Sequence, residues 1–247
     1  MKVITLKPED IHKGPLILVN QKYKAAWEAP DQLIPVGENV LLERQAATLL
    51  DQLMEEIGGW ASIAPVSGWR SMAEQQTIWN DTLQESGLEY TRTYVAVPGC
   101  SEHQTGLAID LGLRQEHIDF ICPEFPDTGI CGEFRRRAAD YGFILRYPAG
   151  KEQITGIGHE PWHFRYVGVP HARIMVENDL TLEEYIPWLQ QFDSPLHPYC
   201  IRLTGRAVYV SYISVSQPLT RIEINEAAPY MISGNNVDGF ILTQWSK

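Results

Sequence analysis

The sequence predicts an α+β fold for residues 1–195 and a small, strand-rich extension over residues 196–247. Two observations predict this division. Segments with the 3.6-residue spacing of helices alternate with short strand-like runs in the larger part, and after "SPLHP" apolar and polar residues alternate as in strands. With 247 residues, of which 44% are hydrophobic, the chain is long enough to bury a core in one large and one small domain.

The first half of the chain predicts two helices and one strand. Residues 1–36 read as an irregular arm with short extended pieces. The next segment, "LLERQAATLLDQLMEEIGG", spaces its apolar residues along one face of an amphipathic helix that the paired glycines end. "ASIAPVSGW" fits a strand that leads into a turn. Ser71 and Glu74 have the spacing of a capping box, so we expect a second helix to begin there and to end at Gly87.

The second half predicts three strands and two further helices, followed by the extension. "GLAIDLG", "FILRYP" and "WHFRYVG" read as strands, and "GEFRRRAADYG" as a helix. Thr181 and Glu184 begin a last helix, "LEEYIPWLQQ", in which Pro187 marks a kink or a boundary. The extension contains the strand patterns "CIRLTGRAVYVSYISV", "TRIEI", "PYMIS" and "GFILT", separated by turn signals, and we expect the domain boundary at residues 194–198.

Charge and composition exclude several classes of protein. The formal net charge is −11 and the acidic residues are spread along the chain, which disfavours binding to nucleic acid or anionic lipid. The amino-terminal segment lacks the shape of a signal peptide, and no segment approaches the length of a transmembrane helix. We therefore expect a soluble, cytoplasmic protein. No cysteines are spaced as CxxC, and Cys122 and Cys131 are either free thiols or a bridge formed in an oxidising compartment.

The stretch "CSEHQTGLAIDLG" contains two candidate metal ligands, His103 and Asp110. A catalytic zinc usually takes three ligands from His, Asp, Glu and Cys and leaves one position open. Gly106 permits a tight turn between the two residues, and Ala108 leaves room beside a metal. An aspartate in the middle of an apolar strand is costly unless it is paired or bound to a cation. The alternatives are that Asp110 caps another element or pairs with an arginine.

The stretch "HEPWHF" supplies a third candidate ligand, His163, and a carboxylate, Glu160. The helical metalloprotease pattern H-E-x-x-H does not apply here, because Pro161 disfavours a helical conformation at the residue before it. An extended E-x-x-H would still bring both side chains to one ion. His159 is disfavoured as a ligand, since adjacent extended residues face opposite ways. A buried core histidine is the alternative for His163.

Four segments in this order, "SGWRSMAEQ", "CSEHQTGLAIDL", "GFILRYPAGKEQITGI" and "HEPWHFRYVG", resemble the VanY/VanXY family of zinc D,D-peptidases over about residues 60–170. The resemblance implies a hedgehog-like D,D-peptidase zinc fold, with a central antiparallel sheet packed by helices. The site residues that it implies are the zinc ligands His103, Asp110 and His163, the catalytic base Glu160, the oxyanion-binding Arg70, and the substrate contacts Ser101 and Gln75.

The resemblance also implies the reaction. The family hydrolyses D-Ala-D-Ala termini of peptidoglycan precursors, so the expected substrates are the D-Ala-D-Ala dipeptide, UDP-MurNAc-pentapeptide or both, in the service of vancomycin resistance. Val97, Cys100 and His159 depart from the residues usual in the family, which leaves the substrate preference open. The alternatives are a lysin-like peptidoglycan endopeptidase and a non-catalytic, zinc-stabilised binding module. The presence of both Glu160 and Arg70 argues against a non-catalytic binding module, since a structural zinc site needs neither a base nor an arginine.

Overall fold

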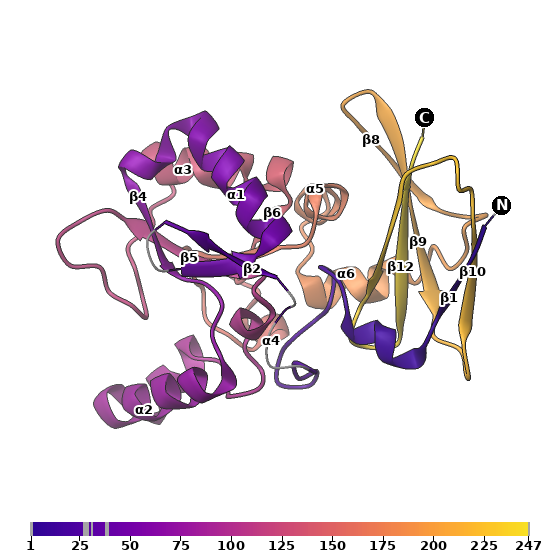
Figure 1. Ribbon diagram of the computed structural model, residues 1–247. Coiled ribbons are helices and arrows are strands. Elements are labelled where there is room, and N and C mark those ends of the chain that lie inside the picture. Colours follow the sequence, from indigo (N-terminus) through magenta and orange to yellow (C-terminus); the bar gives the residue numbers. More distant parts are fainter. Residues whose placement is uncertain (1, 27–29, 31, 38–39, 247) are drawn as a thin grey trace. The chain divides into compact units, whose positions relative to one another are not determined.

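The computed structural model describes residues 2–26, 30, 32–37 and 40–246, and these residues form two units (Figure 1). The larger unit runs from Val19 to Thr181. The smaller unit combines the residues up to Leu18 with those from Leu182 onward. No helix in the described part of the chain is both long enough and apolar enough to cross a membrane.

The sheet of the larger unit has four antiparallel strands. In the order β4-β5-β7-β6, they are Ile63–Ser67, Ala108–Leu113, His163–Tyr166 and Phe143–Leu145. Each strand coincides, to within one residue at its ends, with part of a segment that the sequence predicted to be a strand, so these predictions are confirmed. Strand β5 is buried along nearly its whole length, as its apolar sequence requires. A separate ladder pairs β2 (Leu33–Val36) with β3 (Val40–Glu43).

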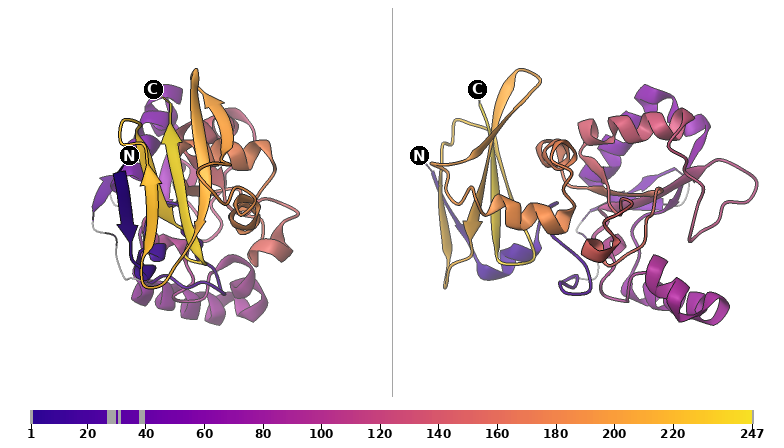
Figure 2. Two further views of the ribbon diagram at one scale, coloured as in Figure 1. Left: turned by 90° about the vertical axis from the view of Figure 1, so that its right-hand side faces the viewer. Right: turned by 180° about the vertical axis from the view of Figure 1, so that it is seen from behind.

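Helices lie on both sides of this sheet, with α1 and α3 on one side and α2 on the other (Figures 1 and 2). The helices of the larger unit are α1 (Arg44–Ile57), α2 (Met72–Tyr94), α3 (Gly129–Arg137), α4 (Glu152–Thr155) and α5 (Val169–Glu177). Its 3-10 turns are η2 (Gly59–Ala61), η3 (Glu102–Thr105) and η4 (Ala138–Tyr141). The fold predicted from the resemblance, a central antiparallel sheet packed by helices, is confirmed.

The smaller unit is built mainly of strands. It contains η1 (Pro8–His12) and α6 (Leu182–Leu189), and its strands are β1 (Lys2–Leu6), β8 (Tyr199–Leu203), β9 (Arg206–Ser214), β10 (Thr220–Ile224), β11 (Tyr230–Gly234) and β12 (Gly239–Trp245). Four strands form a sheet in the order β11-β12-β9-β8, and β1 pairs with β10 in a second sheet. Figure 2 shows β1, in indigo, beside strands coloured orange to yellow, which come from the other end of the sequence.

The helix boundaries differ from the sequence prediction, most clearly in α1 and α2. The predicted third helix is also divided, into α3 and the 3-10 turn η4. The first helix begins at Arg44 rather than at Leu41, because the preceding residues pair as β3 and the Glu43 carboxylate accepts hydrogen bonds from the first-turn amides. The capping box of Ser71 and Glu74 is confirmed, but α2 continues past Gly87. Gly87 adopts a non-helical conformation (φ +81°), which a glycine tolerates, and the helix resumes after this kink.

Residues 1–36 also contain paired strands, whereas the sequence predicted an irregular arm with short extended pieces. Strand β1 completes the smaller unit, whereas β2 belongs to the larger one. The expected division into residues 1–195 and 196–247 therefore differs from the observed grouping, in which α6 and β1 both belong with the carboxyl-terminal strands. Helices α4 and α5 were not predicted. Helix α4 is a single turn, and α5 has Pro170 in its first turn, so neither shows an extended helical period.

Candidate metal centre

The three candidate ligands come from two neighbouring strands and the turn before them. Asp110 of β5 lies directly opposite His163 of β7 in the antiparallel register. Because opposed residues of an antiparallel pair point to the same face, the carboxylate and the imidazole meet there. His103 lies in η3, which Ser101 caps and Gly106 ends in the left-handed conformation (φ +67°). This tight turn brings His103 back to the same face of the sheet.

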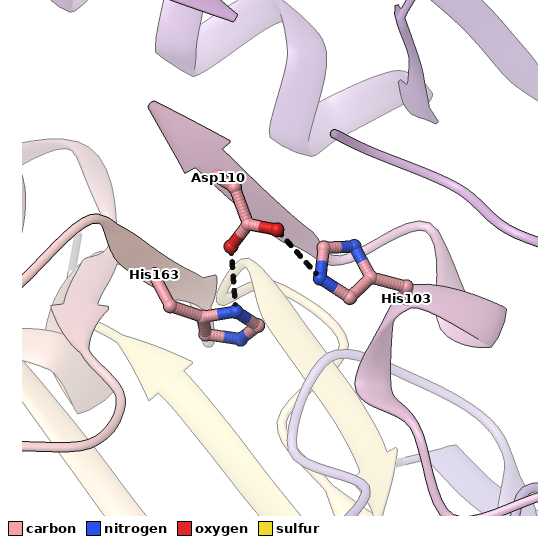
Figure 3. A group of neighbouring side chains, drawn as sticks. All are labelled: His103, Asp110 and His163. Carbon is pink, nitrogen blue, oxygen red and sulfur yellow. Dashed lines mark hydrogen bonds and ion pairs between the residues drawn. The ribbon is translucent and has the colours of Figure 1, made fainter. Parts of the chain in front are cut away.

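Both histidines direct a ring nitrogen at the Asp110 carboxylate (Figure 3). His103 Nε2 lies 3.1 Å from Oδ2, and His163 Nδ1 lies 2.8 Å from Oδ1. The three possible ligand atoms lie within 4.8 Å of one another, and all three side chains are buried. Two imidazole nitrogens and one carboxylate oxygen are the ligand types of a catalytic zinc site with an open position.

The second nitrogen of His103 fixes the protonation of its ring. His103 Nδ1 lies 2.7 Å from the carbonyl oxygen of Gly68, which can only accept, so Nδ1 carries the proton. Burial lowers the pKa of His103, which keeps the imidazole neutral and leaves a lone pair on Nε2. That lone pair faces the Asp110 carboxylate at 3.1 Å. A bound cation would remove the repulsion between these two electron-rich atoms, and the residues therefore fit a divalent metal.

The charges of the other two ligands are coupled. Burial alone would raise the pKa of Asp110, but His103 and His163 outweigh it and hold that pKa well below its ordinary value. Burial would likewise lower the pKa of His163, yet the neighbouring Asp110 raises it to about 10. Asp110 and His163 therefore stabilise each other's charged forms, and a bound metal ion would displace the proton on Nδ1 of His163.

Glu160 lies three residues before His163, next to the ligands. Its amide donates to the carbonyl of Tyr147 (3.1 Å), and its Oε2 lies 3.6 Å from His163 Nδ1. Burial raises the pKa of Glu160 to about 8, although His163 acts in the opposite sense. A carboxyl group that exchanges its proton near neutral pH is suited to general acid–base chemistry. His159 contacts the Tyr147 carbonyl instead (3.0 Å).

Arg70 supplies a cation beside the ligands. Its Nη2 donates to Ser67 Oγ (2.6 Å) and lies 4.0 Å from Asp110 Oδ2. Its Nη1 donates to the side-chain oxygen of Gln75 (2.8 Å), and the amide nitrogen of Gln75 donates to the carbonyl of Ala96 (2.7 Å). Both polar ends of Gln75 are therefore engaged within the protein, and they hold the guanidinium in place.

One pocket is lined by all seven residues that the resemblance implies for the site. These are Arg70, Gln75, Ser101, His103, Asp110, Glu160 and His163. Apolar side chains complete the lining, among them Ile78, Val95, Ile157 and Trp162. A small pocket in which apolar walls surround convergent polar groups is typical of a site for a small ligand.

Sequence reasoning missed a second group of charged residues behind the ligands. Glu102, Arg146 and Arg165 are buried, and each arginine pairs with Glu102. The cost of burying a charge, which singled out Asp110, applies equally to Glu102 in "CSEHQTG" and to Arg146 in "FILRYP". The sequence therefore contained a signal for these charged residues. It could not show that they pair, because they lie far apart in the chain.

Comparisons with known proteins identify the family to which the chain belongs. Residues 39–169 match VanY, D-alanyl-D-alanine carboxypeptidase. The bifunctional D-Ala-D-Ala dipeptidase and D-Ala-D-Ala carboxypeptidase VanXYC of Enterococcus gallinarum is 45% identical over 179 residues, which cover 71% of this chain and 94% of that protein.

Two solved structures extend the comparison. The vancomycin resistance D,D-dipeptidase VanXYg, in complex with a D-Ala-D-Ala phosphinate analog, is 46% identical with a TM-score of 0.97, over 99% of each chain. A mutant of the vancomycin resistance D,D-pentapeptidase VanY from a VanB-type cassette, in complex with Zn(II), is 31% identical with a TM-score of 0.59, over 70% of this chain and 98% of that one. The resemblance seen in the sequence motifs is confirmed: the chain belongs to the VanY family and is a metallopeptidase of the D,D-carboxypeptidase and D,D-dipeptidase type.

Proposed function

We propose that this protein is a zinc-dependent D,D-carboxypeptidase and D,D-dipeptidase that hydrolyses D-Ala-D-Ala termini of peptidoglycan precursors and so contributes to vancomycin resistance. The observation that carries the proposal is the convergence of the His103, Asp110 and His163 ligand set with Glu160 and Arg70 in one pocket. A structural metal site would need neither a buried glutamate of raised pKa nor an arginine beside the ligands.

The ligand set supports zinc as the metal. His103, Asp110 and His163 would hold it, since their donor atoms already converge and leave room for a further ligand. When bound, zinc supplies Lewis-acid activation of water and of the scissile carbonyl. Glu160 takes the proton of the attacking water and passes it to the amine of the departing D-amino acid.

Arg70 acts on the charge that develops during attack. Its guanidinium lies at the ligand face and is held by Ser67 and Gln75, so it need not reorganise when the carbonyl oxygen becomes negative. A preorganised donor of this kind stabilises the transition state by about 3 to 4 kcal/mol. Ser101 and Gln75 line the same pocket, and we place Ser101 beside the substrate.

The charges around the site favour an anionic substrate. Three acidic side chains lie among three basic ones, so the acidic charge does not exceed the basic charge: Glu102, Asp110 and Glu160, with Arg70, Arg146 and Arg165. A divalent cation adds positive charge, which the free carboxylate of a peptide terminus offsets. We therefore propose the D-Ala-D-Ala dipeptide and UDP-MurNAc-pentapeptide as substrates. Both are precursors made inside the cell, and so we place the reaction in the cytoplasm.

The proposal is tested by release of D-alanine from both substrates in parallel, using zinc-loaded protein. We expect turnover of both. Turnover of the pentapeptide alone would restrict the protein to carboxypeptidase activity, and turnover of neither, with zinc shown to be bound, would contradict the proposal.

The Glu160→Gln variant tests the assignment of the base. It should retain zinc and lose about 10²- to 10⁴-fold in kcat, the usual contribution of general acid–base catalysis. The exposed Glu116→Gln makes the same chemical change away from the site and should keep wild-type activity. Wild-type turnover by Glu160→Gln would show that another group moves the proton.

A further inference from the structure

A buried carboxylate lies behind the candidate ligands and is held by two buried arginines. Glu102 Oε1 lies 2.7 Å from Arg146 Nε and 2.8 Å from Arg165 Nη1. The side chains of all three residues are fully buried, with 0% exposure. Both arginines thus reach the same oxygen of Glu102 and fix the orientation of its carboxylate group.

The other oxygen of this carboxylate faces a ligand. Glu102 Oε2 lies 3.8 Å from His163 Nε2, the ring nitrogen opposite the one that faces Asp110. Within the described residues, neither Glu102 Oε2 nor His163 Nε2 has a hydrogen-bond partner, although both atoms are fully buried. Buried polar atoms are rarely left unpaired, because each costs about 1 to 3 kcal/mol. A movement of about 1 Å would bring the two atoms to hydrogen-bond distance.

A contribution to the stability of the fold does not explain why Glu102, Arg146 and Arg165 are buried together. Burying one acid and two bases is expensive, and apolar residues of similar volume often serve a fold as well or better. The arrangement does have a chemical consequence at His163. An imidazole binds a metal through one nitrogen only if the proton is on the other, and a carboxylate at that other nitrogen holds the proton there.

We propose that Glu102 is a positioning residue for the metal centre: it accepts a hydrogen bond from His163 Nε2 and thereby leaves Nδ1 free to bind the metal. Arg146 and Arg165 hold the carboxylate in the orientation that this contact requires. The inference rests on the metal centre of the proposed function and adds to it a residue outside the ligand set. Loss of such a partner typically weakens metal binding about 10- to 100-fold.

The Glu102→Gln variant tests this directly, because the two arginines dictate which end of the amide faces His163. They donate only, so they attract the amide oxygen and turn the NH₂ group toward His163 Nε2. That nitrogen must then accept, which moves the ring proton to Nδ1, the ligand atom. We expect about 10- to 100-fold weaker zinc binding in competition with a chelator, and an altered visible spectrum of the Co²⁺-substituted protein, in variants shown by circular dichroism to be folded.

Controls separate this inference from the proposed function. Glu116→Gln removes the same charge from an exposed position of the same unit and should bind zinc like the wild type. Wild-type zinc affinity and Co²⁺ spectrum in Glu102→Gln would overturn the role of Glu102 while leaving the enzyme assignment intact. A wild-type protein that binds no zinc would contradict both.

A second measurement needs no variant. In the zinc-loaded wild type, imidazole ¹⁵N spectra should place the proton of His163 on Nε2 and show it protected from exchange. A proton on Nδ1, or an Nε2 proton that exchanges as in an exposed histidine, would overturn the inference even if Glu102→Gln failed to fold.

Discussion

Gln75 could contact the substrate or hold Arg70 in place, and a single substitution distinguishes these two roles. It lines the pocket, as a substrate contact would, but its amide oxygen accepts from Arg70 and its amide nitrogen donates to the Ala96 carbonyl. We propose that it acts mainly by holding Arg70. Gln75→Leu should therefore lower kcat about tenfold or more with little change in KM, because a small misplacement of a transition-state group is costly.

Steady-state kinetics on the D-Ala-D-Ala dipeptide would check this prediction. The neighbouring Gln76→Leu is the matched control, since Gln76 is exposed on the same helix and should keep both constants. A rise in KM at unchanged kcat would instead identify Gln75 as a substrate contact.

At the residue scale, the sequence predicted the site wherever a single residue was costly or belonged to a specific motif. Asp110 stands out as a charge in an apolar strand, and His103 and His163 stand out by their spacing within recognisable segments. The function of Glu102 could not be predicted in this way. The proposed role of Glu102 depends on its ion pairs with Arg146 and Arg165. These residues are far apart in the sequence and come together only in the folded protein.

At the element scale, the turn between the first two ligands depends on Gly106. Its φ of +67° is in the left-handed region, and a Cβ there would lie 3.0 Å from the Glu43 amide nitrogen. Gly106→Ala should therefore lose about 1 to 2 kcal/mol from backbone strain, a further amount from crowding, and part of its zinc affinity, because η3 carries His103. Urea unfolding and chelator competition would measure the two effects.

Gly58 provides the control for that substitution. Its φ of +65° is nearly the same, but nothing lies within 4 Å of an added Cβ. Gly58→Ala should show the strain without the crowding and should bind zinc normally. If the two variants lost equal stability and both kept zinc, the position of η3 would not depend on Gly106.

Helices and strands were predictable where the signal lay within a short segment of the sequence. The capping box at Ser71 and the alternation in "GLAIDLG" each specify an element from a few adjacent residues, and both are confirmed. The end of α2 was not predictable in the same way. Glycine usually ends a helix, but at Gly87 the chain kinks and the helix resumes, with the Thr91 hydroxyl donating to the Gly87 carbonyl.

At the scale of the whole molecule, the pairing of the amino-terminal strand was the least predictable feature. Strand β1 is short, and its partner β10 lies near the other end of the sequence, with Ile4 opposite Ile222. Strand patterns in a sequence specify which face is buried, but they do not specify the partner, because that choice depends on the rest of the fold. The consequence is that the smaller unit requires both ends of the chain.

This dependence predicts that a substitution near the amino terminus destabilises the carboxyl-terminal strands. Ile4 packs against the buried cluster of Ile222, Ile224 and Leu242. Because Ile4 is only partly buried, Ile4→Ala should lose about 1 to 2 kcal/mol, less than the roughly 2 to 5 kcal/mol of a fully buried site. Amide hydrogen exchange should show the loss of protection in β10 and β12, while β5, β7 and the zinc affinity stay unchanged.

The adjacent residue provides the matched control, because side chains alternate along a strand. Val3 is 55% exposed and lies on the opposite face of β1, so Val3→Ala should leave the exchange of both units close to that of the wild type. Equal effects of the two substitutions would mean that β1 contributes only its backbone hydrogen bonds. Loss of protection in β5 as well as β10 would mean that the two units unfold together, so that damage to the strand-rich unit would also reach the metal centre.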